Sequence, residues 1–384
     1  MIQSLVAVPS VSSHEPELDT SNQGVVDHLA QWASELGGRC TIEPVPGLPG
    51  KVNLIATFGP IDTGEPAGLL LSGHTDVVPV DADRWTSDPF AATERDGRLY
   101  GRGTADMKSF LALATTAVSR LDRDRLRRPV VILGTADEET SMAGARALVD
   151  AGGPAATRAI IGEPTGMQPI TAHKGIVMGQ LELLGRSGHS SQPGLGANAI
   201  DGMQAVLAAL QILRQEWATS LRDPTFDVPE PTMNFGALHG GDAPNRICPG
   251  CTLTFDVRVV PGMAAERVQR QIHECAVAAL EGTGVRAEYH PMFVPIPPFA
   301  NAGSELVQTL ERATGQRAGS VMFGTEAPFL QQLGMDTVVM GPGRIDVAHM
   351  PDEHIALAEL EPAIELLGSL ITRYCASKLE SMTS

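Results

Sequence analysis

The spacing of hydrophobic residues predicts alternating helices and strands along much of the chain. Apolar residues recur three or four positions apart across residues 24–36, which predicts an amphipathic helix that ends at Gly37-Gly38. Residues 107–122 predict a second helix. Short, unbroken apolar runs predict strands that are buried on both faces, at residues 68–71, 129–135, 159–161 and 337–340. Strands and helices in this order indicate an α/β sheet covered by helices on both faces.

The middle of the chain has a different pattern. Residues 176–184 alternate between apolar and polar side chains, as a half-buried strand does, and a long amphipathic helix is predicted next. The full predicted order is β-α-β-β-α-β, the split ferredoxin-like arrangement, over residues 176–184, 198–221, 232–238, 251–260, 264–280 and 285–290. We therefore expect two domains: a catalytic domain of residues 1–175 and 291–384, and an inserted domain of residues 176–290.

Polar residues follow each of the four predicted buried strands. Open α/β sheets bind their ligands beyond the carboxyl ends of the strands, so these side chains are expected to converge. One more carboxylate, Asp106, stands at the head of the helix predicted over residues 107–122. The residues that follow the strands are His74, the pair Glu138-Glu139, Glu163 and His349.

Two imidazoles and three carboxylates are ligands that suit zinc, manganese or cobalt. A single metal ion seldom takes five protein ligands and keeps an open position, whereas two ions that share a carboxylate can. Asp106 is the expected bridge, because the helix dipole favours a carboxylate at a helix N-terminus. Asp76 is expected to accept a hydrogen bond from the other ring nitrogen of His74. The five candidate ligands are His74, Asp106, Glu139, Glu163 and His349, with His354 competing with His349.

Glu138 adjoins a candidate ligand but points elsewhere, so it is the expected general base. Taken one at a time, these residues also have structural interpretations: His74 as a buried core histidine, Glu138-Glu139 as an acidic pair at a helix start, and Glu163 as a strand end. Their occurrence together favours catalysis.

Composition narrows the class of protein. The net charge of −17 and the pI near 5.0 argue against nucleic acid or an anionic membrane as a partner, because both would be repelled. No apolar run reaches the roughly 20 residues that cross a bilayer. The first Lys or Arg is Arg39, and the five cysteines are scattered. These features predict a cytoplasmic enzyme in a reducing compartment.

Two further motifs in the sequence are also compatible with other functions. Residues 194–199 match the dinucleotide-binding pattern G-x-G-x-x-A, but the nearest predicted strand ends at residue 184, so a loop and helix start are expected instead. Cys248 and Cys251 have redox spacing without the βαβ context of a redox protein. A catalytically inactive binding protein is disfavoured, because Glu138 and all five ligand candidates are present.

The chain resembles the M20 metallopeptidase family over nearly its whole length. The motifs that carry the resemblance are GHTDVVP, YGRGTADMK, TADEETSMAGA, IIGEPT, AHKG, SGHSSQP, HGGDAPNRICPGC, DVRVVPGM, FGTEAPF, GPG and AHMPDEH. The resemblance implies a zinc-exopeptidase-like mixed-sheet α/β/α catalytic domain with an inserted ferredoxin-like lid or dimerisation domain. It also implies two Zn²⁺ ions, replaceable by Co²⁺, and a cis peptide between Asp106 and Met107.

The resemblance further implies roles for individual residues. His74 and Glu163 would hold one metal ion, Glu139 and His349 the other, and Asp106 would bridge them. Glu138 would be the acid/base, and Asp76 the partner of His74. His189 would stabilise the oxyanion in the partner subunit of a homodimer. Residues that contact the substrate carboxylate in relatives match Lys174, Asn245 and Arg258.

The resemblance also implies the reaction, hydrolysis of N2-acetyl-L-ornithine to L-ornithine and acetate, a step of arginine biosynthesis. Arg258 suits the substrate α-carboxylate, because a guanidinium binds a carboxylate in bidentate fashion. Glu326 is a hypothesis for the partner of the substrate's side-chain ammonium. Succinyl-diaminopimelate, other N-acyl amino acids and dipeptides stay open as alternative substrates.

Overall fold

The computed structural model describes residues 1–61, 64–301 and 303–376, and the chain divides into two compact units. Unit 1 comprises Met1–Thr171, Asn301–Gly319 and the chain from Thr325 onward. Unit 2 comprises Ala172–Ala300 and Ser320–Gly324. The inserted segment, expected at residues 176–290, thus extends over residues 172–300 in the structure.

Within the described residues, the largest sheet has nine strands and is mixed, which confirms the predicted fold class. The strand order is β1-β2-β6-β3-β7-β15-β8-β13, and β14 pairs with β8. Strand β3 is parallel to β6 and β7, and β15 is parallel to β7. The strands are β1 (Arg39–Pro44), β2 (Val52–Phe58), β3 (Leu69–His74), β6 (Val130–Thr135), β7 (Arg158–Pro164), β8 (Ile170–His173), β13 (Phe299–Ala300), β14 (Gly319–Val321) and β15 (Asp336–Gly341).

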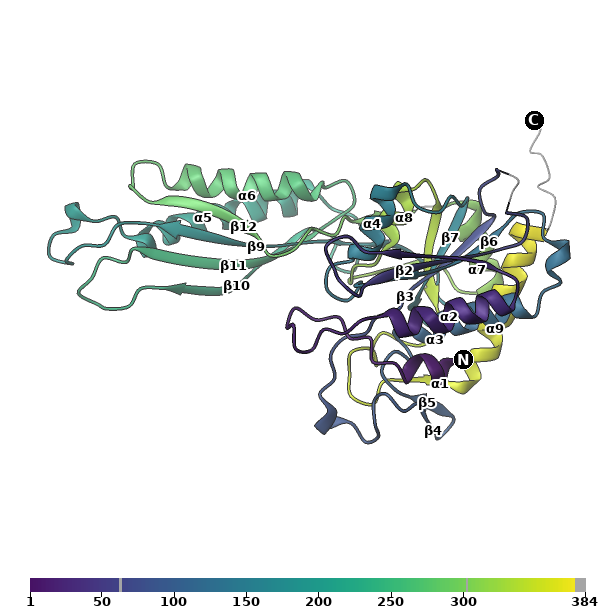
Figure 1. Cartoon of the computed structure of the whole chain (residues 1–384). Coiled ribbons are helices and arrows are strands. Elements are labelled where there is room, and N and C mark those ends of the chain that lie inside the picture. The colour runs from purple at the N-terminus through teal and green to yellow at the C-terminus, as the bar shows by residue number, and fades with distance from the viewer. Residues whose placement is uncertain (62–63, 302, 377–384) are drawn as a thin grey trace, which may run out of the picture. The chain divides into compact units, whose positions relative to one another are not determined.

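Helices cover both faces of the sheet in unit 1. Figure 1 shows α2, α3 and α9 on one face and α4 and α8 on the other. Helix α3 is buried along almost its whole length, because it packs against β3, α1 and α9. The helices are α1 (Ile2–Val6), α2 (Gln23–Glu35), α3 (Lys108–Ser119), α4 (Ala143–Ala151), α7 (Glu305–Thr314), α8 (Ala327–Gln332) and α9 (Leu357–Ile371). A small sheet joins β16 (His354–Ala356), β5 (Arg98–Tyr100) and β4 (Thr93–Arg95).

Unit 2 is an antiparallel four-stranded sheet in the order β10-β11-β9-β12. Helices α5 and α6 lie on one face of it (Figure 1). Burial alternates along β9 and β11, so one face of each strand packs into the core, as the period of two predicts. The elements are β9 (Gly175–Leu184), α5 (Ala199–Ser220), β10 (Thr232–Gly240), β11 (Gly250–Val259), α6 (Ala265–Ala279) and β12 (Arg286–Pro291).

The glycine-rich segment before α5 is a helix start. The side chain of Asn198 accepts a hydrogen bond from the Ile200 amide and caps the helix. At Gly196, an added Cβ would lie 2.5 Å from Ile247 and 2.8 Å from the Arg186 carbonyl oxygen, so protein atoms fill this space. Among the described residues, no helix has the length and apolar character needed to span a membrane.

Gly162 in β7 fixes how closely α3 approaches the sheet. A Cβ at this position would lie 1.9 Å from Cγ of Phe110, which is itself buried. We expect Gly162→Ala to cost on the order of 3 kcal/mol, because the overlap must displace α3. Gly368→Ala is the matched control: its Cβ would meet no atom within 4 Å in helix α9, and stability should rise by up to about 1 kcal/mol. Urea denaturation measures both, and equal midpoints would contradict the packing argument.

Candidate metal centre

Four parallel strands deliver the candidate ligands to one edge of the sheet. Strands β6, β3, β7 and β15 are neighbours, and their carboxyl ends meet at the same edge. His74 is the last residue of β3, and Glu163 lies near the end of β7. The turn with Glu138 and Glu139 follows β6, and the loop with His349 follows β15.

Asp106 lies between two imidazoles and presents a different oxygen to each. Its Oδ1 is 2.9 Å from Nε2 of His74, and its Oδ2 is 3.2 Å from Nε2 of His349. The same nitrogen of His349 is 3.0 Å from Oε2 of Glu139. Two ligands that share a tetrahedral zinc ion are separated by roughly 3.3 Å, given metal–ligand distances near 2.0–2.2 Å. The contacts have hydrogen-bond lengths, and one ligand atom each of His74, Asp106 and Glu139 lies within 4.8 Å of the others, close enough to hold a metal ion.

Asp76 orients two parts of the site. Its backbone carbonyl accepts the hydrogen bond from Nδ1 of His74 at 2.9 Å, which leaves Nε2 directed at Asp106. The Asp76 carboxylate is 3.8 Å from that Nδ1 and instead accepts from the backbone amides of Glu138 and Glu139, at 3.3 and 3.2 Å. His74 thus contacts Asp76 through the backbone carbonyl and not through the carboxylate, which holds the turn of Glu138 and Glu139.

The loop after β15 places His349, and not His354, among the carboxylates. His354 pairs with Tyr100 in the small sheet, and its Nδ1 contacts the Asp352 carbonyl oxygen. The peptide between Asp106 and Met107 is cis, as the family resemblance implied.

The electrostatics of this edge indicate a site that needs cations. Burial raises the pKa of Glu138 and Glu163 well above its usual range, and neighbouring carboxylates raise it further. Burial lowers the pKa of His74, but the hydrogen bond and charge of Asp106 outweigh burial, so its pKa lies well above the usual value. The pKa of His349 rises to about 10, because Asp106 and Glu139 outweigh its burial. Protonated imidazoles thus neutralise part of the negative charge of the carboxylates, as bound divalent cations would. The set of donor atoms therefore fits a metal centre.

Glu353 was not predicted as a site residue. It is fully buried, and its carboxylate accepts a hydrogen bond from the backbone amide of Asp106 at 3.0 Å. No signal in the sequence singles out Glu353, because its neighbours Asp352 and His354 are also polar and its burial is evident only in the structure.

The predicted substrate contacts are distributed over both units. Lys174 is buried and donates to the Glu230 carbonyl oxygen at 2.7 Å. Arg258, 29% exposed, pairs with Asp256 at 3.0 Å. The residues of this set that lie in unit 2 are Lys174, His189, Asn245 and Arg258.

Glu326, in unit 1, is 1% exposed. Its Oε2 accepts from the Thr135 hydroxyl at 2.8 Å, and its Oε1 has no hydrogen-bond partner within the described part of the chain. Burial raises the pKa of Glu326 to about 7.

Comparison with known proteins decides the family. The profile of Peptidase family M20/M25/M40 matches residues 70–373. The chain belongs to this family. This M20 chain is 44% identical to the acetylornithine deacetylase of Proteus mirabilis over 98% of its own length and 97% of that protein. It is 45% identical to the acetylornithine deacetylase of Pasteurella multocida, with the same shares covered.

Solved structures agree on the fold of this M20 chain. The aminopeptidase PepT of Bacillus cereus matches with a TM-score of 0.75 at 21% identity, over 96% of both chains. An M20 family metallo-carboxypeptidase of Sulfolobus solfataricus matches with a TM-score of 0.73 at 18% identity, over 97% of this chain and 98% of the other. M20 enzymes are metal-dependent hydrolases, which agrees with the donor set at the sheet edge.

The buried carboxyl of Glu326 predicts a pH dependence of stability in the metal-free protein. Its pKa is about 7 when folded, against 4.5 for an ordinary glutamate, so the folded state binds more protons than the unfolded state between these values. Stability should therefore fall as pH rises from about 5 to 8, by on the order of 3 kcal/mol from this group. Glu326→Gln should remove that part of the slope, and Glu305→Gln, at the surface, should not. Urea denaturation in chelator at both pH values tests this, and an unchanged slope in Glu326→Gln would count against a raised pKa.

Proposed function

We propose that this M20 chain removes the acetyl group from N2-acetyl-L-ornithine, giving L-ornithine and acetate. The contact of Asp106 with two imidazoles through different oxygens supports a hydrolytic metal centre. Curated relatives at 42–45% identity are acetylornithine deacetylases, which supports the choice of substrate. The reaction would serve arginine biosynthesis. A cytoplasmic location is supported by the five cysteines, all free thiols.

The proposed centre holds two Zn²⁺ ions, which Co²⁺ could replace. His74 and Glu163 would hold one ion, Glu139 and His349 the other, and Asp106 would bridge them. The site fits this assignment because Asp106 offers one oxygen to each side and the charge of Glu163 acts on both His74 and Asp106. When bound, such ions lower the pKa of a water molecule and polarise the amide carbonyl.

Glu138 would take the proton from the attacking water and return it to the leaving nitrogen. Its carboxyl is raised in pKa by burial and by the charge of Glu163, which suits a group that must both accept and donate a proton. The Asp76 carboxylate holds its backbone amide, so the turn that carries Glu138 is fixed relative to β3.

Several of the predicted residues would bind the substrate's charged groups. Arg258 would bind the α-carboxylate, with Lys174 and Asn245 as further contacts, and His189 would stabilise the oxyanion. Glu326 is the proposed partner of the substrate's side-chain ammonium, because its Oε1 is a buried acceptor to which no described residue donates a hydrogen bond.

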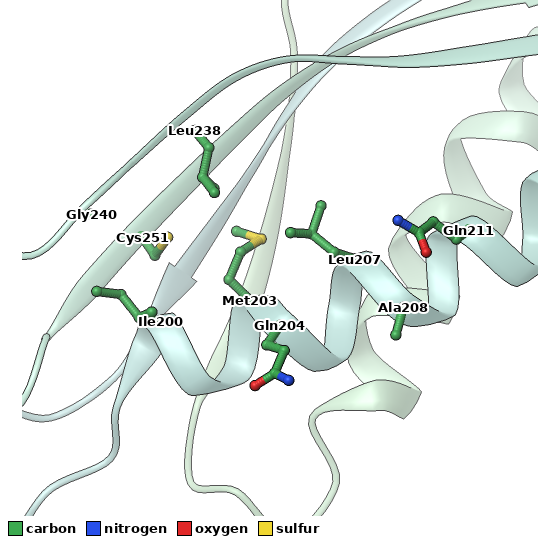
Figure 2. A pocket seen from close by; sticks show the side chains of 9 residues that line it. All are labelled: Ile200, Met203, Gln204, Leu207, Ala208, Gln211, Leu238, Gly240 and Cys251. Atoms are coloured by element: carbon green, nitrogen blue, oxygen red, sulfur yellow. The ribbon is translucent and has the colours of Figure 1, made fainter.

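A homodimer through unit 2 is part of the proposal. Strand β10 is an edge of the four-stranded sheet, so one side of its backbone is unpaired by this sheet. Beside it, a groove of about 560 Å³ lies between α5 and the strands, with Ile200 and Leu238 46% and 51% exposed (Figure 2). A second copy related by a two-fold axis would bring β10 to β10 and cover these apolar side chains, since such an interface is self-complementary.

Steady-state kinetics on the zinc-loaded protein test the substrate. We expect N-acetylornithine to be hydrolysed with a kcat/KM far above that for N-succinyl-diaminopimelate. Glu138→Gln should lower kcat by a factor of about 100 to 10,000 with bound metal retained, because general acid–base catalysis contributes that much. Glu326→Gln should lower selectivity for the ornithine side chain. Equal rates on both substrates would contradict the assignment as an acetylornithine deacetylase. A Glu138→Gln variant with native activity would contradict the proposed role of Glu138 as the general base.

Subunit complementation tests the dimer and His189 together. Analytical ultracentrifugation should show a dimer for the native chain and a monomer for Leu238→Glu, while Val277→Glu, at an exposed apolar residue of α6, should stay dimeric. His189→Ala and Glu138→Gln should each be inactive as homodimers. Their equal mixture, after subunit exchange, should recover about a quarter of native activity, because half the dimers would hold one complete site. A native monomer, or no recovery in exchanged dimers, would contradict this arrangement.

A further inference from the structure

Glu353 is a charged residue with no exposed surface beside an already anionic site. Burying a carboxylate costs free energy unless hydrogen bonds and an opposite charge compensate it. Glu353 has both kinds of partner. Its Oε2 accepts from Nη1 of Arg102 at 2.6 Å, and Arg102 is itself 3% exposed.

The other oxygen of Glu353 gathers three backbone amides of the loop that ends at Asp106. Oε1 accepts from the amides of Gly103, Ala105 and Asp106, at 3.0, 2.9 and 3.0 Å. Three amides that converge on one oxygen fix the path of the loop and the direction of the Asp106 backbone, from which its side chain projects. The carboxylate therefore acts on Asp106 through the main chain.

Backbone hydrogen bonds also join the segment that carries Glu353 to the same loop. The carbonyl oxygen of Glu353 accepts from the Gly101 amide at 2.9 Å, and His354 pairs with Tyr100 across β16 and β5. His349 lies four residues upstream on that segment. One buried side chain thus connects the loop of Asp106 with the segment of His349, the two residues that contact each other in the site.

We infer that Glu353 is a positioning residue of the metal centre, and that its carboxylate holds Asp106 so that one oxygen faces each imidazole. The inference rests on the proposed metal site, but not on the choice of substrate. A neutral, apolar contact could join the two segments, whereas only an acceptor can satisfy three buried amides and pair with Arg102 at once. Glutamine has the right shape, but its NH2 group would face either the guanidinium of Arg102 or the three backbone amides, and all of these are donors.

The test compares Glu353→Gln with an ion pair elsewhere in unit 1 in which only the lysine is buried. Lys51 is 2% exposed, pairs with Asp19 at 2.7 Å and donates to the carbonyl oxygens of Val11 and Thr20. Asp19→Asn therefore removes the charge that pairs with the buried Lys51, in a loop contact that does not involve Asp106. Each full-length protein is stripped of metal and titrated with Zn²⁺ by calorimetry, and the visible spectrum of its Co²⁺ form is recorded. Urea denaturation of the metal-free forms measures stability separately.

Glu353→Gln should weaken binding of both Zn²⁺ ions by about 10- to 100-fold, the usual cost of losing a residue that orients a ligand, and should shift the Co²⁺ spectrum. Asp19→Asn should lose stability and keep native affinity and spectrum. Glu353→Asp, which keeps the charge but cannot reach both partners, serves if the glutamine variant does not fold, with the same expectation. Native Zn²⁺ affinity and Co²⁺ spectrum in a Glu353 variant would overturn the inference. Failure of the native chain to bind Zn²⁺ would instead overturn the metal site itself.

Discussion

The concentration of carboxylates at one buried edge of the sheet is the constraint on which this structure depends. Burial and neighbouring carboxylates raise the pKa of Glu138, Glu139 and Glu163, whereas the two imidazoles lower the pKa of Asp106 in spite of its burial. The two imidazoles neutralise only part of the negative charge of these carboxylates, and they do so by taking up protons. Such an arrangement is costly in an ordinary core, and persists where cations are meant to bind.

The scaffold brings these groups together through parallel strands rather than through local sequence. β6, β3, β7 and β15 end at the same edge, so residues from four distant parts of the chain become neighbours. Gly162 lets α3 lie close against β7, and the loop before that helix supplies Asp106. The hydrogen bonds of Asp76 and Glu353 then set the orientation of side chains that the strands only bring near.

The sequence was most informative where the pattern is local. Buried strands and long helices such as α5 were predicted within a few residues, because their periodicity is set by burial along one element. Short elements such as α7, α8 and β16 were not predicted, since they hold too few turns or alternations to show a period. Glu353 contacts Asp106 across 247 positions, and no spacing rule reveals such a pair. The sequence likewise does not show whether the carbonyl or the carboxylate of Asp76 accepts the hydrogen bond from His74, because this depends on the rotation of one side chain.

Metal binding and proton transfer are coupled in the proposed mechanism through charge alone. In the metal-free protein, burial and the charge of Glu163 raise the pKa of Glu138 well above its usual range, which favours the protonated carboxyl. Divalent cations at the neighbouring ligands would lower that pKa, because they stabilise the ionised form. The ionised form of Glu138, which accepts a proton, would then be more populated when the centre is loaded. This coupling needs no movement of the chain, because Asp76 already fixes the turn on which Glu138 lies.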